Sequence, residues 1–197
     1  MQTEIEVKFL DIDIDNVRAR LASAGAVCEQ PMRLMRRALV ETPEMAAIDA
    51  FLRLRDEGDK VTLTYKQHLK TGVEAAKEIE TTVGDFDTAK ALLEASGLTF
   101  HTYQESKRET WKLGGVEVVI DEWPWMPPYI EIEGPDEAAV KASAAALGFD
   151  WNDAVFGGAD VVYQMLYDMS DGTRGVIDIP DVRFGVELPA QFQSKRG

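Results

Sequence analysis

The stretch Glu4-Ile5-Glu6-Val7-Lys8 decides the fold of this chain, because charged residues alternate along it with β-branched apolar residues. Side chains of a β-strand point alternately to its two faces, so the stretch predicts a strand with one charged and one apolar face. The pattern returns as Glu78-Ile79-Glu80 and as Glu131-Ile132-Glu133. One acidic strand face is usually just the solvated side of a sheet. Three copies favour a shared role for the acidic residues.

Each acidic strand is followed by the same kind of segment. A break that contains Asp or Pro leads into a short apolar run with helical spacing, and Gly25, Gly97 or Gly148 follows that run. Asp and Pro are favoured at helix starts, and glycine is favoured just after helix ends. The sequence therefore predicts a strand–helix unit that is used three times, without a fixed period along the chain.

Strands with basic faces lie between the acidic ones. Phe51-Leu52-Arg53-Leu54-Arg55 places both arginines on one face, and residues 61–66 place Lys66 beside two threonines. The turn between these two stretches contains a glycine, so we expect them to form a hairpin. Because arginine and lysine also occur on ordinary solvated faces, each strand taken alone has a second, purely structural interpretation.

A second hairpin is predicted around Gly114-Gly115, with Arg108 on one face of its first strand. The prolines between Trp123 and Pro128 exclude a regular strand and predict a loop. Its tryptophans either pack at the end of the fold or form a wall on which a base stacks. A helix is expected over residues 159–167.

Composition excludes several classes of function. The 197 residues carry a formal net charge of −14 and are 45% hydrophobic, which suits one globular domain and argues against nucleic-acid or membrane-surface partners. We expect a cytoplasmic protein, since no apolar signal is seen near the start and Cys28 has no partner for an internal disulfide. His68 and His101 lack the spacing of a zinc site.

The strand patterns favour a barrel. About eight candidate strands have a charged and an apolar face, and a closed barrel can place the apolar faces outward under helices and the charges inside. Six inward glutamates would repel one another unless basic side chains or a divalent metal offset them. An acidic barrel held by internal ion pairs alone is the structural alternative.

The ordered charged residues resemble the CYTH family, also called triphosphate tunnel metalloenzymes. The resemblance covers residues 1–167, while the tail over residues 168–197 has no match. It implies an α+β fold with an eight-stranded antiparallel closed barrel, which forms a tunnel, and helices packed outside. The residues that carry the resemblance are Glu4, Glu6, Lys8, Arg53, Arg55, Lys66, Glu78, Glu80, Arg108, Asp121, Glu131 and Glu133.

The resemblance also implies roles. Basic residues would grip a triphosphate, which carries about four negative charges, and Lys8, Arg55 and Lys66 are expected to be catalytic as well. Acidic residues would hold Mg²⁺ or Mn²⁺, which would bridge the phosphates and, in a hydrolase, activate water. The expected substrate-binding residues are Lys8, Arg53, Arg55, Lys66 and Arg108. The expected metal residues are Glu4, Glu6, Glu131 and Glu133, with Asp121, Glu78 and Glu80 as second-rank metal or orienting groups.

Two positions depart from the family pattern. Family members often have a basic residue two positions before the arginine that matches Arg108, and this chain has Ser106 there, with Lys107 out of register. Many members have a glycine in the loop before the last acidic strand, where this chain has Met126-Pro127-Pro128. Both departures bear on which substrate is accepted.

Triphosphate hydrolysis is the expected activity, with tripolyphosphate or an organic triphosphate as the small-molecule partner. Class IV adenylate cyclase, which converts ATP to cyclic AMP and pyrophosphate, is the alternative. A protein that only binds triphosphate or polyphosphate is the second alternative. The sequence leaves the oligomeric state open, a homodimer included.

Overall fold

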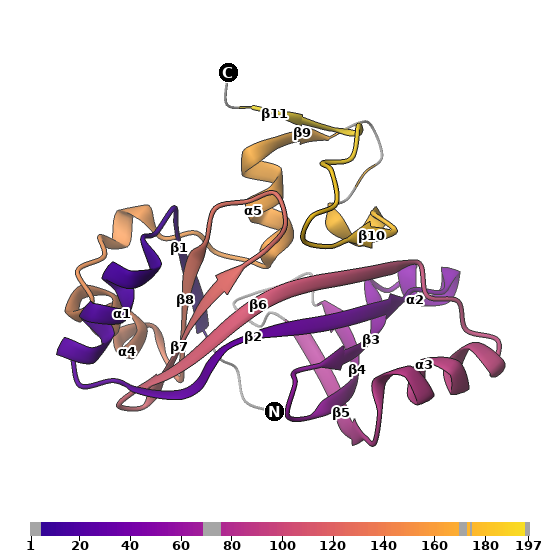
Figure 1. Cartoon of the computed structure of the whole chain (residues 1–197), viewed down its shortest axis with the longest axis horizontal. Helices are drawn as coiled ribbons and strands as arrows, with labels where there is room; N and C mark the ends of the chain where they lie inside the picture. Colours follow the sequence, from indigo (N-terminus) through magenta and orange to yellow (C-terminus); the bar gives the residue numbers. More distant parts are fainter. Residues whose placement is uncertain (1–4, 69–75, 170–172, 174, 196–197) are drawn as a thin grey trace.

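The computed structural model describes residues 5–68, 76–169, 173 and 175–195, and it is an α+β fold built on one large sheet (Figure 1). The strands of this sheet and the helices between them are β1 (Ile5–Leu10), α1 (Ile14–Ser23), β2 (Val27–Val40), α2 (Pro43–Ala46), β3 (Ala50–Asp56), β4 (Val61–His68), β5 (Ala76–Val83), α3 (Phe86–Ala95), β6 (Thr102–Leu113), β7 (Val116–Glu122), β8 (Tyr129–Gly134) and α4 (Glu137–Ala146). The remaining elements are η1 (Trp151–Asp153), α5 (Ala159–Leu166), β9 (Tyr167–Met169), η2 (Val176–Asp178), β10 (Asp181–Val182) and β11 (Phe192–Ser194).

The main sheet follows the order β1-β8-β7-β6-β2-β3-β4-β5, and every neighbouring pair on this path is antiparallel. Both predicted hairpins are present, as β3–β4 and β6–β7. The long strands β2 and β6 pair along most of their length and join the two halves of the sheet (Figure 1). Residues 123–128 form a loop, as their prolines predict.

The structure differs from the fold prediction in one respect, which is that hydrogen bonds between strands do not close the barrel within the described residues. β1 and β5 lie at the two ends of the strand order, and no ladder joins them within the described residues. The outer edge of β1 is occupied by Val155 instead. The Lys8 amide donates to the Val155 carbonyl at 2.8 Å, and the Val155 amide donates to the Lys8 carbonyl at 2.9 Å. Because these backbone groups of Lys8 are already bonded, β5 cannot pair with them.

The three strand–helix units are confirmed. Helices α1, α3 and α4 start at Asp13, Asp85 and Asp136, whose carboxylates accept hydrogen bonds from the backbone amide three residues further on, at 2.8, 2.7 and 2.8 Å. Such caps satisfy amides that have no partner inside the helix. The glycine after each helix has a positive φ, of 79° at Gly25, 92° at Gly97 and 76° at Gly148.

The two faces of the sheet separate apolar from charged side chains. Helices α1 and α4 cover the outer face of β1, β8 and β7, where the buried core residues are Val7, Phe9, Val17, Leu21, Val116, Val118, Ile120, Ile130, Ile132, Val140, Ala144 and Leu147. In the other half, Phe86 of α3 packs against Ala38 and Leu54. The charged residues at the intervening positions must therefore share the opposite, inner face.

The C-terminal segment packs onto one end of the sheet. β10 pairs in parallel with β6 at Tyr103 and Gln104, where β7 no longer runs beside β6. The Thr102 hydroxyl donates to the Ile179 carbonyl at 2.5 Å, and the Gln104 amide donates to the Val176 carbonyl at 3.2 Å. Figure 1 shows α5 and β9 to β11 gathered on this side of the molecule.

No helix in the described residues is both long enough and apolar enough to cross a membrane.

Candidate functional site

Strands β1 and β8 bring an ammonium group and carboxylates together on the inner face. Lys8 lies opposite Glu131 in the ladder, and Glu6 lies opposite Glu133. The Lys8 Nζ lies 2.7 Å from Glu131 Oε2 and 3.1 Å from Glu6 Oε1. Burial works to lower the pKa of Lys8, but attraction to Glu131 and Glu6 outweighs it and raises the pKa above its usual value. Lys8 is therefore a buried cation at neutral pH.

The acidic residues beside Lys8 fit a divalent cation. Glu6, Glu131 and Glu133 can place one carboxylate oxygen each within 4.8 Å of one another. Carboxylate oxygens are the ligands that Mg²⁺ and Mn²⁺ prefer. Lys8 contacts one oxygen of Glu6 and one of Glu131, and the second oxygen of Glu131 lies 3.7 Å from Arg108 Nη2, beyond hydrogen-bond distance. Glu4, predicted to belong to this group, lies outside the described residues.

Arg108 is fixed by Asp121 on the neighbouring strand β7. Its Nε and Nη2 donate to Asp121 Oδ1 and Oδ2 at 2.8 and 2.6 Å, and its Nη2 lies 3.7 Å from Glu131 Oε1. Burial works to lower the pKa of Arg108, but Asp121 and Glu131 hold it well above its usual value. Both Asp121 oxygens are engaged, which favours the orienting role over the metal role for this residue.

A cluster of guanidinium groups lies at the centre of the inner face. Arg37 of β2 lies opposite Arg55 of β3, and Arg53 lies two residues from Arg55 on the same side of its strand. The buried Nε atoms of all three arginines have no hydrogen-bond partner in the described part of the chain. Burial and then repulsion by Arg55, Arg53 and Arg108 lower the pKa of Arg37 to about 9. Burial and then Arg55 lower the pKa of Arg53 to about 10. Such a cluster favours an anionic ligand.

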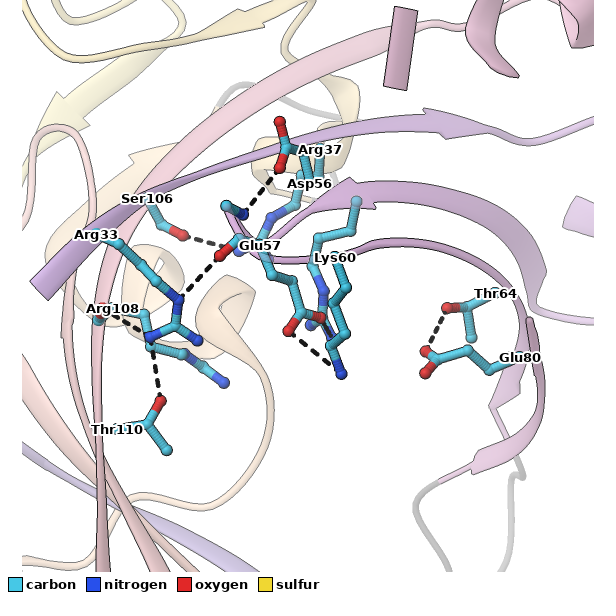
Figure 2. A network of polar contacts seen from close by, with 12 residues as sticks. Arg33, Arg37, Asp56, Glu57, Lys60, Thr64, Glu80, Ser106, Arg108 and Thr110 are labelled. Atoms are coloured by element: carbon cyan, nitrogen blue, oxygen red, sulfur yellow. Dashed lines mark hydrogen bonds and ion pairs between the residues drawn. The ribbon is translucent and has the colours of Figure 1, made fainter. Parts of the chain in front are cut away.

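Protein groups hold several basic residues near this centre. Glu57, which is 6% exposed, forms an ion pair with Arg55 and lies 3.5 Å from the Lys60 ammonium. Arg33 donates from Nε to the Glu57 carbonyl at 2.9 Å and from Nη1 to the Thr110 hydroxyl at 3.4 Å. Figure 2 shows Arg33, Glu57, Lys60 and Thr110 together with Arg108 and the Arg37–Ser106 contact. Glu57 therefore orients Arg55, and Arg33 of β2 links the end of β3 to β6.

Strands β4 and β5 form the other arm of the site. Lys66 Nζ lies 2.8 Å from Glu78 Oε1, and the Thr64 hydroxyl donates to Glu80 at 2.7 Å (Figure 2 shows the second contact). Partial burial of Glu78 works to raise its pKa, but Lys66 lowers it below the usual value. Lys66 also helps to lower the pKa of Glu131, after Lys8 and Arg108, so it acts electrostatically on the β8 carboxylate.

The predicted site residues that the structure describes lie on one face of the sheet. The structure also shows which way Ser106 and Lys107 point. Ser106 is 1% exposed, points inward and accepts a hydrogen bond from Arg37 Nη2 at 2.8 Å. Lys107 points to the other face, where its Nζ lies 4.8 Å from the Phe184 ring centroid and 3.6 Å from Glu122.

Sequence reasoning misses Arg37. The register of β2 against β6 shifts between Cys28 and Gln30 and again between Gln30 and Arg33, so simple alternation does not run through the strand. Arg36 and Arg37 are adjacent, and the pairing shows that Arg37 shares the inner face with Arg55. The signal that could have found it is the next residue, Ala38. Because Ala38 is apolar and faces the core, its neighbour Arg37 must face the opposite, inner side of the sheet.

The loop over residues 123–128 packs against the C-terminal segment. The Trp123 ring, 5% exposed, meets the Tyr163 ring edge-on at 6.4 Å and lies under the Arg37 guanidinium at 4.3 Å. The Trp125 indole donates to the Val186 carbonyl at 2.6 Å. These contacts favour the packing interpretation of the two tryptophans over a base-stacking wall.

A separate cavity of about 630 Å³ lies on the outer side of β1, against α1. Its lining residues are Leu10, Asp11, Ile12, Asp13, Asn16, Val17, Arg20 and Phe149. One arginine among two aspartates and apolar groups offers an anion far less than the inner face does.

Comparison with known proteins agrees with this geometry. A family model described as the CYTH domain matches residues 2–151, well over half of the chain. Among curated proteins, none matches the chain.

Solved structures share the fold at low sequence identity. A conserved hypothetical protein from Pyrococcus furiosus is 24% identical, with a TM-score of 0.62 over 77% of this chain and 94% of the other. A protein from Vibrio parahaemolyticus described as a candidate adenylate cyclase is 17% identical, with a TM-score of 0.68 over 83% and 98%. A protein from Hippeastrum described as a candidate adenylyl cyclase with a dominant triphosphatase activity is 14% identical, with a TM-score of 0.54 over 79% and 91%.

Proposed function

Because the chain belongs to the CYTH domain family, we propose that it is a divalent-metal-dependent enzyme that hydrolyses a triphosphate on its inner charged face. The observation that supports this most is that a group of basic side chains and a group of acidic side chains lie on the same face, each suited to a ligand of opposite charge. The buried Nε atoms of Arg37, Arg53 and Arg55 have no hydrogen-bond partner in the described part of the chain, and these arginines share the inner face with a group of carboxylates that fits a cation. A polyanion together with a divalent cation would satisfy both groups.

Substrate binding falls to the basic residues. Arg53 and Arg55 can each present two parallel N–H groups to phosphate oxygens, while Lys8 and Lys66 act as point charges. Arg108 reaches the same anion from β6, with Asp121 holding its guanidinium. Phosphoryl transfer depends chiefly on positioning and charge neutralisation, so we assign the catalytic role to Lys8, Arg55 and Lys66.

Metal binding falls to Glu6, Glu131 and Glu133, with Glu4 as a further predicted ligand. A bound Mg²⁺ or Mn²⁺ would neutralise phosphate charge and polarise the phosphoryl group under attack. Glu78 orients Lys66, and Glu80 fixes Thr64 on the opposite arm. We place this unit in residues 1–167, with residues 168–197 as a tail whose described part packs on it.

The cyclase alternative requires a firm hold on a base and a ribose. The two tryptophans best suited to stack a base are engaged with Arg37, Tyr163 and Val186. This favours hydrolysis over cyclisation.

The test is to incubate the purified protein with Mg²⁺ or Mn²⁺ and with tripolyphosphate or ATP, and to separate the products by chromatography. Orthophosphate without cyclic nucleotide is the expected result. Cyclic AMP with pyrophosphate would assign the cyclase activity. Thermal stabilisation by tripolyphosphate and Mg²⁺ without any product would make the protein a binder and end the enzyme proposal.

A further inference from the structure

We propose that Arg37 and Ser106 form a subsite for the terminal phosphoryl group of a short linear phosphate, at the end of the inner face that the C-terminal segment closes. This inference rests on the proposed function, because it names the part of the substrate that the site would hold. It concerns two residues that the family motifs do not include, one of which stands where relatives often carry a basic side chain.

No described carboxylate pairs with Arg37, whereas Arg55 and Arg108 on the same face are paired with Glu57 and Asp121. The Arg37 Nη2 donates to Ser106 at 2.8 Å, and its Nε is buried without a hydrogen-bond partner in the described part of the chain. Arg36, the next residue on the strand, is bound to Asp56 at 2.6 Å. An unpaired buried cation is costly to keep unless a ligand completes it.

The contacts of Arg37 also orient its guanidinium plane. The group lies over the Trp123 ring at 4.3 Å, so the indole occupies one side of it. Ser106 holds one edge and leaves the Nε edge for an acceptor. Arg37 lies opposite Arg55 in the β2–β3 ladder, with Arg53 two residues further along the same side of β3, so the three guanidinium groups can act on one anion.

The side behind Arg37 is filled. Trp123 packs against Tyr163, and Gln104, opposite Arg37 in the ladder, donates to the Val176 carbonyl at 3.2 Å. β10 extends the sheet beyond the end of β7 at this point. A phosphate chain that reaches Arg37 therefore ends there. The geometry suits a triphosphate with a free terminal phosphoryl group, and it does not suit the middle of a long polyphosphate.

A purely structural role for Arg37 makes the opposite prediction for stability. If Arg37 served only to join Trp123 and Ser106, replacing it with Met would loosen the C-terminal segment. If it is a ligand group, Met of similar volume removes repulsion among the arginines, and the ligand-free protein should be as stable or more stable. The conservative Arg37→Lys variant keeps the charge and loses the planar fork.

The experiment compares Arg37→Met with Arg36→Met, a matched control on the same strand whose side chain pairs with Asp56 on the other face. Titration calorimetry with tripolyphosphate and with pyrophosphate, in Mg²⁺, gives the affinities, and thermal unfolding without phosphate gives the stabilities. We expect Arg37→Met to weaken tripolyphosphate binding about tenfold or more and pyrophosphate binding far less, because the shorter chain spans fewer subsites. Its Tm should be equal to or above that of the wild type. Arg37→Lys should recover part of the affinity.

A lower Tm with unchanged tripolyphosphate affinity would overturn the subsite, as would equal losses for both phosphates or for both variants. A wild type that binds neither phosphate would also overturn it. Turnover is scored separately. Binding with the expected pattern and no product removes the proposed hydrolysis and keeps the subsite, while normal hydrolysis by Arg37→Met with unchanged affinity removes the subsite and keeps the hydrolysis.

Discussion

Lys8 and Glu131 face each other across strands β1 and β8, with Nζ 2.7 Å from Oε2 and side-chain exposures of only 2% and 9%. The pair is a buried structural contact, and it also belongs to the candidate site. Removing one partner of a buried pair leaves the other charged and poorly compensated, at a cost of about 3–5 kcal/mol.

Replacing Lys8 with Met should lower the free energy of unfolding by roughly that amount. The same variant leaves Glu6, Glu131 and Glu133 without their ammonium, so Mn²⁺ should raise its Tm more than it raises that of the wild type. Thermal unfolding in EDTA and in Mn²⁺ measures both effects, with Lys141→Met, an exposed lysine on α4, as the control. Equal Tm values for variant and wild type in EDTA would contradict the prediction.

Arg55→Ala should weaken tripolyphosphate binding and reduce kcat together, by about tenfold or more in kcat/KM. The reason is that a guanidinium contact acts on the ground state and on the transition state. Steady-state kinetics measure the effect, and Arg36→Ala on the outer face should change little. Unchanged kinetics in Arg55→Ala would show that β3 does not contact the substrate.

Glu133→Gln should chiefly raise the concentration of Mg²⁺ or Mn²⁺ needed for half-maximal turnover, because an amide is a weaker ligand than a carboxylate. Metal titrations at saturating substrate give this concentration. Glu137→Gln on α4, where the carboxylate pairs with Lys141, is the control. A lower kcat at an unchanged metal requirement would place Glu133 outside the metal site.

Stability at acid pH should depend on Glu109, on the outer face of β6. Burial works to raise its pKa, but hydrogen bonds from Arg18, at 2.7 Å, and from Trp111, at 2.7 Å, lower it below the usual 4.5. A lowered pKa adds stability that is present above about 4.5 and is lost as the pH falls through the folded-state pKa.

The wild type should therefore lose more stability than Glu109→Gln between pH 5 and pH 3. At pH 7 the variant should be less stable by about 1.5–3 kcal/mol, since a charge-assisted hydrogen bond is removed. Urea unfolding at pH 7 and between pH 5 and pH 3 measures both differences in stability. Parallel curves for variant and wild type would show that the contact does not titrate.

The sequence predicts the parts of the fold that local chemistry controls. Alternation in residues 51–55 and 61–66 gives the β3–β4 hairpin, and aspartates followed by apolar runs and glycines give α1, α3 and α4. The same alternation places Lys8, Arg53, Arg55, Lys66, Arg108 and the described acidic residues on one face. These features need only the period of a strand and the preferences of helix ends.

The rest depends on long-range contacts. Arg37 is hidden because it stands beside Arg36 and before three consecutive apolar residues, so the sequence shows no alternation there; the pairing with β3 shows that Arg37 faces inward. Val155 takes the edge of β1 through two backbone bonds, which no side-chain pattern reveals. The described part of the tail packs through short apolar stretches, which include Val176 and Ile179. These stretches are too short to show the periodicity of a strand or a helix.

The pairing of β1 with β8 has a consequence for the order of folding. β1 is the first strand of the chain and β8 is the last of the eight that form the main path, so their ladder cannot form before all the intervening strands have been synthesised. Contacts so distant in sequence are slow to form, because the loop between them must first be ordered. Lys8, Glu6 and the β8 glutamates therefore come together late, and a nascent or truncated chain that stops before Glu131 lacks part of the proposed set of metal ligands.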